Sequence, residues 1–367
     1  MDELSNILLK ACREGKVEVI KFMVQNNAQL VKNKDAKRNT ALHVACENGI
    51  MADGIECLYS ACPEAIEAWN KEGGSPFHMA CFHGKSLANI KFLHSKHPKG
   101  LETPNENGDL PIHWISENTS EEFIEYLLEQ YPKSAEVMNN EGALAIHIAC
   151  KKGFSMNVIR VLHKAHPAGI LQPDIDGKLP IHDACEGVVV SNLELMEFFH
   201  HVSPEALQKA DNKGNLALHY TVCSNPDVVK FVTQANVDAL KVSNNYGYLP
   251  IHKACSLSAD VEIIKILHEN YPDGVRTQTS KGILPFHLAI TSPSLVNHLH
   301  GLYDGAVKTP DINGRFPIHI ACEQGSFVGC FKLLTIMTSF SFTFFLKALH
   351  LKSLNSSWIN FQLLQEK

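Results

Sequence analysis

Apolar and polar positions follow one another along this chain in a pattern that returns every 32 to 37 residues. Each copy begins with a short, mostly apolar stretch such as Ile181–Cys185. A longer segment follows, in which apolar residues stand three and four positions apart, as in Phe123, Ile124, Leu127 and Leu128. This spacing places apolar side chains on one face of an α-helix. The pattern therefore predicts a short helix and then a longer helix in every copy.

A histidine marks the same place in nine copies of the pattern, directly after an apolar residue of the predicted short helix. A fixed period of this length is typical of repeat architectures, whose core grows by stacking. It also explains how 367 residues could fold without separate globular cores. The nine motif histidines, for which we predict a structural role, are His43, His78, His113, His147, His182, His219, His252, His287 and His319.

Turn and boundary residues keep the same phase as the histidines. Gly stands five residues before eight of the nine, usually three residues after Asp or Asn, as in Asp211 and Gly214. Asx followed by Gly at this spacing predicts a tight turn, because Gly accepts a positive φ. Six copies place Pro two residues before the His, as at Pro180, which predicts a helix start. Gly153 is expected to end a short helix, and Pro132 to close a copy.

This order of turn, short helix and longer helix resembles the ankyrin repeat, whose signature is Thr-Pro-Leu-His with Ala two residues later. Residues 35–334 carry nine such repeats, and residues 1–34 are expected to form an N-terminal capping unit in which Leu9 takes the histidine's place. The resemblance implies an all-α ankyrin-repeat solenoid of stacked helix-turn-helix units with short connecting turns. Tyr-Pro or His-Pro replaces the usual Gly-Ala after the second helix, which predicts a longer linker between repeats.

Residues 335–367 depart from the repeat pattern and form a hydrophobic tail. Their uncharged run, Leu333 to Leu346, is shorter than the ~18–20 residues that span a bilayer. Three interpretations stay open: an atypical helical cap, a tail that inserts partly into a membrane, or translated sequence foreign to the native protein. We favour an ill-fitting or foreign tail over a membrane anchor.

Composition places the chain among folded, intracellular proteins. Hydrophobic residues make up 45% of the sequence and charged residues 20%, which leaves no room for wholesale disorder. The net charge of -6 comes without a basic patch, so we expect no nucleic acid partner. Acidic residues and Lys10 occupy the N-terminal stretch, so no secretion signal is predicted. We expect a monomer in the cytoplasm or nucleus, with no membrane partner and with its 11 cysteines as free thiols.

The spacing of His182 and Cys185 would put two zinc-binding side chains on one helix face. A metal site or redox sensor is therefore one alternative. Ser116 and Val222 replace the Cys in other repeats, however, and an obligatory ligand would not be exchanged for Val. We therefore favour packing for Cys and hydrogen bonding for His.

The motif histidines are expected to bond to backbone groups. The family's usual Thr partner is replaced by Leu or Phe in seven of the nine repeats. If the histidines are buried and neutral, their folded pKa is lowered, so stability is predicted to fall below pH ~6.5. The chain contains no catalytic or nucleotide-binding motif, so we expect neither enzymatic activity nor a cofactor.

The resemblance implies a protein-protein interaction scaffold or adaptor that binds a partner protein through a concave face and turn tips. A second alternative is an adaptor tethered to a membrane by the tail. Tyr246 and Tyr248 are the preferred anchors, because aromatic residues often form hot spots. The expected contact residues are Glu106, Asn107, Asp109, Glu117, Asn118, Glu141, Lys151, Lys152, Asp176, Lys178, Glu186, Tyr246, Tyr248, Arg315, Glu323 and Gln324.

Overall fold

The computed structural model describes residues 3–186 and 193–337, and this part of the chain contains helices and connecting turns but no β-strand. The chain divides into two compact units, an N-terminal unit, Met1–Asn212, and a C-terminal unit that starts at Lys213. Each is a stack of helix pairs, so the all-helical class predicted from sequence is confirmed for these residues.

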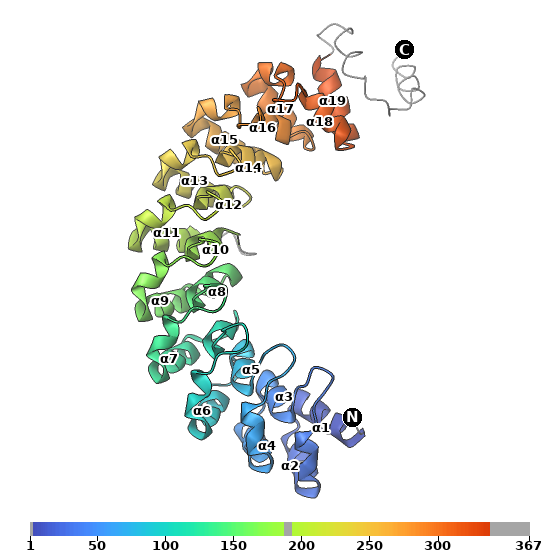
Figure 1. Ribbon diagram of the computed structural model, residues 1–367, viewed down its shortest axis with the longest axis vertical. Helices are drawn as coiled ribbons and strands as arrows, with labels where there is room; N and C mark the ends of the chain where they lie inside the picture. The colour runs from blue at the N-terminus through green and yellow to red at the C-terminus, as the bar shows by residue number, and fades with distance from the viewer. Residues whose placement is uncertain (1–2, 187–192, 338–367) are drawn as a thin grey trace. The chain divides into compact units, whose positions relative to one another are not determined.

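In the N-terminal unit the first helices of successive repeats pack on one another, and so do the second helices. Figure 1 shows the first helices following one another along one side of this unit and the second helices along the other. The first helices are α1 (Glu3–Arg13), α3 (Ala41–Asn48), α5 (Pro76–His83), η4 (Pro111–Trp114), α8 (Ala145–Lys152) and α10 (Pro180–Glu186). The second helices are α2 (Val17–Asn26), α4 (Ala52–Ala61), α6 (Leu87–Lys96), α7 (Glu121–Gln130), α9 (Met156–Ala165) and α11 (Leu193–Val202).

The C-terminal unit repeats this arrangement within itself. Its first helices are α12 (Ala217–Thr221), α14 (Pro250–Ser256), α16 (Pro285–Leu288) and α18 (Pro317–Glu323). Its second helices are α13 (Pro226–Ala235), α15 (Val261–Asn270), α17 (Pro293–Leu302) and α19 (Phe327–Met337).

The start and end of the first helices follow the predicted signals. Pro180 is the first residue of α10, where its missing N–H leaves no helical hydrogen bond unmade. Gly153 ends α8 in the left-handed region with φ 69°. Gly214, five residues before its histidine, has φ 76°. Arg38 fills that place in the one repeat without Gly and is also forced to a positive φ of 63°. The tight turn is therefore confirmed.

The sequence suggested that a proline after the second helix closes the repeat, but in six of nine cases this proline begins a further short helix. Pro132 begins a 3₁₀ helix whose Ala135 is buried. The longer linker is thus a third short helix in every repeat before that of α18 and α19, packed against the second helix. These 3₁₀ helices are η1 (Ala28–Lys32), η2 (Pro63–Glu67), η3 (Pro98–Leu101), η5 (Pro132–Ala135), η6 (Pro167–Leu171), η7 (Pro204–Gln208), η8 (Val237–Lys241), η9 (Pro272–Arg276) and η10 (Asp304–Lys308).

The core lies between the two layers of helices in each unit. Phe123, Ile124 and Leu127 of α7 are all buried, as the 3.6-residue spacing predicts. Burying side chains of this size stabilises the fold by about 1.5–3 kcal/mol each. Because each repeat has only one apolar face per helix, this burial is complete only when neighbouring repeats stack.

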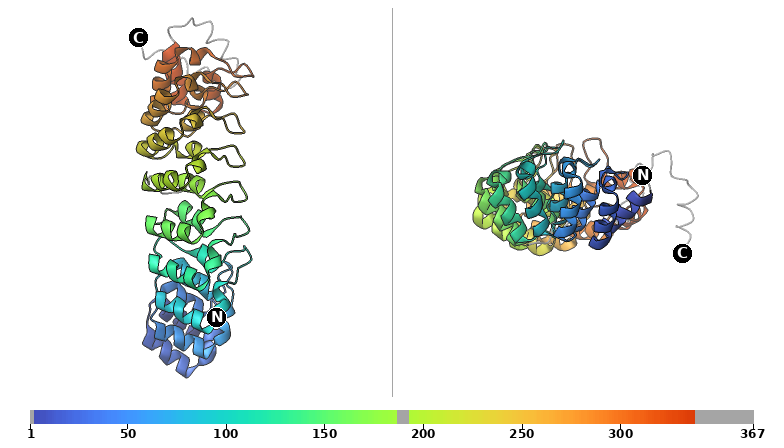
Figure 2. Two further views of the ribbon diagram at one scale, coloured as in Figure 1. Left: turned by 90° about the vertical axis from the view of Figure 1, so that its left-hand side faces the viewer. Right: turned by 90° about the horizontal axis from the view of Figure 1, so that it is seen from below.

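Hairpin turns between the repeats project from one edge of each unit (Figure 2). Asn105 holds one such turn, since its Oδ1 accepts hydrogen bonds of 2.9 Å from the backbone N–H groups of Asn107 and Asp109. One backbone hydrogen bond often joins a turn to the turn before it, such as the 3.0 Å bond from Ile175 N–H to the Glu141 carbonyl. The turn tips are therefore held in register with one another.

The last described helix, α19, ends at Met337 and so includes the first three residues of the predicted tail, 335–367. The rest of that tail, residues 338–367, lies outside the described residues. No helix in the described ranges is both long and apolar enough to cross a bilayer.

Candidate functional site

Seven motif histidines connect their repeat to the next, with Nδ1 bonded inside the repeat and Nε2 bonded to the following one. In His147, Nδ1 accepts a hydrogen bond of 3.2 Å from Leu144 N–H, and Nε2 lies 3.3 Å from the Lys178 carbonyl of the following repeat. Since Nδ1 accepts, Nε2 carries the proton and donates it. The Nε2 acceptors of the other linked histidines lie at 2.9 to 3.2 Å and are the carbonyls of Gly74, Asp109, Val137, Lys209, Tyr248 and Ile283.

A hydroxyl group partners the histidine only where the sequence retains one. Thr40 Oγ1 and Ser75 Oγ each lie 2.8 Å from the Nδ1 atom of their histidine. In the other seven repeats the backbone N–H of Leu or Phe takes over, which confirms the predicted backbone partners. His287 is an exception at its other nitrogen, since Nε2 makes no hydrogen bond of ordinary geometry to the described residues.

His182 and Cys185 point to different partners. His182 Nε2 lies 3.0 Å from the Lys209 carbonyl, whereas Cys185 Sγ packs 3.7 Å from Met196 Sδ. Burial lowers the pKa of His182 and raises that of Cys185, so both stay neutral. In the described parts of the chain, no group of three His, Cys, Asp or Glu side chains is arranged to hold a metal ion. The geometry of this pair favours the packing interpretation.

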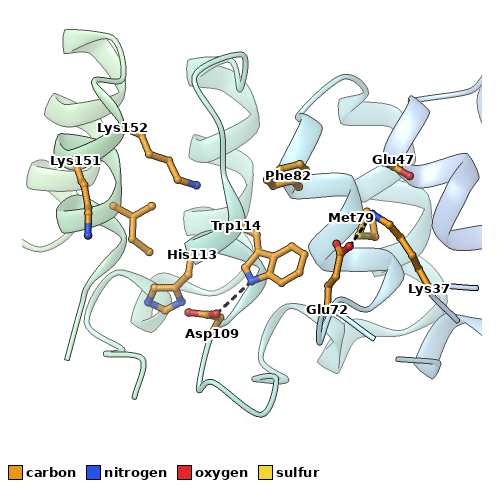
Figure 3. A pocket seen from close by; sticks show the side chains of 11 residues that line it. Lys37, Glu47, Glu72, Met79, Phe82, Asp109, His113, Trp114, Lys151 and Lys152 are labelled. Carbon is orange, nitrogen blue, oxygen red and sulfur yellow. Dashed lines mark hydrogen bonds and ion pairs between the residues drawn. The ribbon is translucent and has the colours of Figure 1, made fainter. Parts of the chain in front are cut away.

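The N-terminal unit carries an open groove of about 620 Å³ on its first-helix side, which we call the Trp114 groove (Figure 3). Its apolar floor consists of Met79, Phe82, Trp114 and Ile148. Its polar lining residues are Lys37, Glu47, Glu72, Asp109, His113, Lys151 and Lys152.

A shortened first helix creates this groove. The repeat of His113 forms only the single 3₁₀ turn η4, after which Ile115 leaves the helix with an extended backbone. The equivalent α5 and α8 on either side each run for eight residues. The missing second turn leaves a gap between α5 and α8, and the Trp114 side chain lies in it, half-buried.

Aromatic contacts and one hydrogen bond fix the Trp114 ring. The ring meets His78 edge-on, with centroids 5.3 Å apart, and Phe82 with centroids 6.1 Å apart. Its Nε1 donates to Asp109 Oδ2 at 3.3 Å, and Asn139 Nδ2 donates to the other Asp109 oxygen at 2.8 Å. The indole is therefore preorganised and keeps part of its surface exposed.

Charges in the groove are segregated along its length. At one end Lys37 pairs with Glu72 at 2.8 Å, and Glu47 Oε1 lies 3.7 Å from His83. At the other end Lys151 and Lys152 of α8 stand together, and the described residues offer neither of them an ion pair. Burial lowers the pKa of Lys152, while Glu117 and Asp109 act in the opposite direction. The α8 end thus holds two lysines without an ion pair to the described residues, and Glu117 and Asp109 are the carboxylates that act on Lys152.

The structure distributes the predicted contact residues over both units and brings three of them, Asp109, Lys151 and Lys152, into the Trp114 groove. Exposed positions on turns and helix ends are occupied by Glu106, Asn107, Glu117, Asn118, Glu141, Asp176, Glu186, Tyr246, Glu323 and Gln324.

Three predicted contact residues instead interact within their own repeat. Lys178 was expected to be exposed, but it is only 8% exposed and pairs with Glu186. Arg315 binds Asp311 and Glu323. Tyr248, one of the two preferred anchors, is stacked on His252 at 5.9 Å with an interplanar angle of 11°. Tyr246 is 63% exposed and remains available for contact.

Sequence reasoning missed Trp114, Phe82 and Met79 as site residues. The signal was present at the residue directly after each motif histidine, which changes from Met79 to Trp114 to Ile148 in successive repeats. Variation beside an invariant position indicates that the two side chains face different surroundings. A large aromatic at such a place would have pointed to the groove.

Comparison with protein-family models and with curated proteins gives no match to this chain.

Proposed function

We propose that this chain is an ankyrin-type repeat stack that binds a partner protein and catalyses no reaction. The observation that carries the proposal is the Trp114 groove, where rigid repeats leave partly exposed aromatic surface beside unpaired lysines. Tightly bound protein surfaces often centre on such aromatic residues. The left-handed glycines and the hydrogen bonds between turns keep this surface preorganised, which lowers the entropy cost of binding.

The bonding of the histidines favours binding over catalysis. Among the described residues, His113 is the only histidine that lines the groove. Its Nδ1 accepts a hydrogen bond from Leu110 N–H at 2.9 Å, and its Nε2 lies 3.0 Å from the Val137 carbonyl. A general base needs a free nitrogen within reach of its substrate. A histidine that holds two repeats together cannot take that role without breaking the link.

Affinity capture tests this proposal. The full chain serves as bait beside a variant with Lys151→Ala, Lys152→Ala and Tyr246→Ala. The matched control carries Lys164→Ala and Lys230→Ala, two exposed lysines on the second helices α9 and α13. We expect the same protein to be retained by the native chain and the control and to be lost with the triple variant. Equal capture by all three, with all three folded, would place the binding surface elsewhere.

A second candidate, a thiol-based redox response, is favoured by one contact in the C-terminal unit. Cys322 Sγ and Cys330 Sγ lie 3.2 Å apart, whereas the cysteines at the other motif positions are buried. Burial raises the pKa of Cys330 to about 12, which disfavours the reactive thiolate. Treatment with hydrogen peroxide would convert the pair to a disulfide and two water molecules. A mass decrease of two hydrogens in the native chain, with no such decrease in Cys330→Ser, would support this candidate. A native chain whose thiols are unchanged after treatment would rule it out.

A further inference from the structure

The Trp114 groove has an apolar middle that a large side chain could fill. Phe82 is 41% exposed, and Trp114 and Ile148 are each partly exposed on the groove floor. Figure 3 shows the Trp114 ring lying between Phe82 and the lysines of α8. Adding an apolar side chain here would remove water from three hydrophobic surfaces at once.

The charge pattern restricts what could accompany that apolar group. Lys151 and Lys152 lie at the α8 end without ion-pair partners among the described residues, so a carboxylate placed there would gain a charge-assisted contact. At the opposite end, the Lys37–Glu72 pair and Glu47 offer no surplus positive charge. The favoured ligand is therefore acidic at one end only.

A nucleic acid or polyphosphate fits this groove poorly. Its polar lining holds Glu47, Glu72 and Asp109 against Lys37, Lys151 and Lys152, so acidic and basic side chains balance. An extended polyanion would have to pass the carboxylates as well as the lysines, and it has no large apolar group to cover the floor. A peptide can place apolar and acidic side chains in different parts of the groove.

We infer that the Trp114 groove binds a short peptide segment of the partner, which sets a large apolar side chain against Trp114 and Phe82 and neighbouring carboxylates against Lys151 and Lys152. This inference rests on the proposed protein-binding function and names the class of partner segment for it.

Selection from a random dodecapeptide display library tests the inference directly with the folded full-length chain. We expect enrichment of peptides that combine an aromatic or large aliphatic residue with nearby Asp or Glu. A synthetic peptide from the enriched set, labelled with fluorescein, then gives affinities by fluorescence anisotropy. Trp114→Ala is expected to weaken binding by about 30-fold or more, the range of an interface hot spot, and Trp114→Phe by less.

The exposed lysines provide variants that do not disturb the core. Charge reversal by Lys151→Glu and Lys152→Glu is expected to abolish the preference for acidic peptides and to favour basic ones. Lys164→Glu on α9, also exposed, is the matched control and should keep the original preference. Raising the salt concentration should weaken binding to the native chain more than to Lys151→Ala/Lys152→Ala, because salt screens exposed charges.

Several results would overturn the inference. The ligand class is ruled out if the enriched peptides lack acidic residues or if no peptide is enriched. It is also ruled out if the folded Trp114→Ala variant binds the selected peptide with unchanged affinity. If the groove variants still capture the same protein as the native chain, the inference fails while the protein-binding function stands. If neither peptides nor any protein bind, both fail together.

Discussion

Acid sensitivity is the prediction that follows most directly from the histidine links. Burial is the main cause that lowers the pKa of five motif histidines from 6.5 to about 4, namely His43, His78, His147, His252 and His287. A histidine with a lowered folded pKa takes up its proton more readily when the chain unfolds. Its contribution to stability is complete above pH ~6.5 and is lost as the pH falls toward 4.

The magnitude is large for a marginally stable fold. At pH 5 each such histidine lowers the free energy of unfolding by about 2 kcal/mol relative to neutral pH, so the five together lower it by about 10 kcal/mol. Asp183 opposes this loss, because burial raises its pKa from 3.8 to about 7. A raised pKa stabilises the fold as the pH drops, here by about 2.5 kcal/mol between pH 7.5 and pH 5. The net loss remains comparable to the whole stability of a typical domain.

Urea unfolding followed by circular dichroism at pH values from about 7.5 to about 5 measures this effect. His147→Gln retains one acceptor and one donor but removes a titrating group, so its acid-induced loss is expected to be smaller by about 2 kcal/mol. Asp183→Asn removes the opposing group, so its loss should be larger by a similar amount. A native free energy of unfolding that stays constant over this range would refute the reasoning, as would a His147→Gln chain with the native pH dependence.

Three further predictions concern single positions. In thermal unfolding, Gly177→Ala should destabilise the fold more than Gly314→Ala. Both positions have φ near +75°, so an alanine costs about 1–2 kcal/mol of backbone strain at either one. Only the Cβ added at Gly177 would meet a neighbour, 2.8 Å from Asn212 N. Equal losses would contradict this. Arg38→Gly should raise the melting temperature, because glycine adopts the positive φ of 63° at this position without strain. A lower melting temperature in the variant would show that Arg38 is not strained. Iodoacetamide should label exposed Cys223 before buried Cys81, and simultaneous labelling would contradict the burial.

The repeating frame could be predicted because its signals are local. A Gly at positive φ and a Pro at the first helical position act through their own backbone, so their identity and spacing suffice. The histidine partners could also be anticipated, since Leu in place of Thr leaves the backbone N–H as the remaining local donor. The 3₁₀ helices after the second helices were missed because segments of four or five residues are stabilised by packing rather than by their own pattern.

Most of the candidate site could not be predicted from local sequence signals. The Trp114 groove depends on how far the first helix continues after His113, and the chain leaves the helix at Ile115 for a turn in which Ser116 N–H donates to Thr119 Oγ1 at 3.1 Å. Lys178 and Tyr248 occupy variable turn positions that suggested exposure, yet Glu186 and His252 engage them within their repeats. Sequence spacing identifies the places that can vary, whereas burial and partners decide which of them remain available.

The histidine link also bears on how such a chain can lengthen. Each linked repeat supplies one donor to the next repeat and one acceptor to the repeat before it, as His147 donates to Lys178 and His113 to Val137. Duplication of a complete period would therefore insert a new donor together with a new acceptor and leave no buried group unmatched. Loss of part of a period would separate them. The bonding pattern thus tolerates evolutionary gain or loss of whole repeats and selects against breakpoints within one.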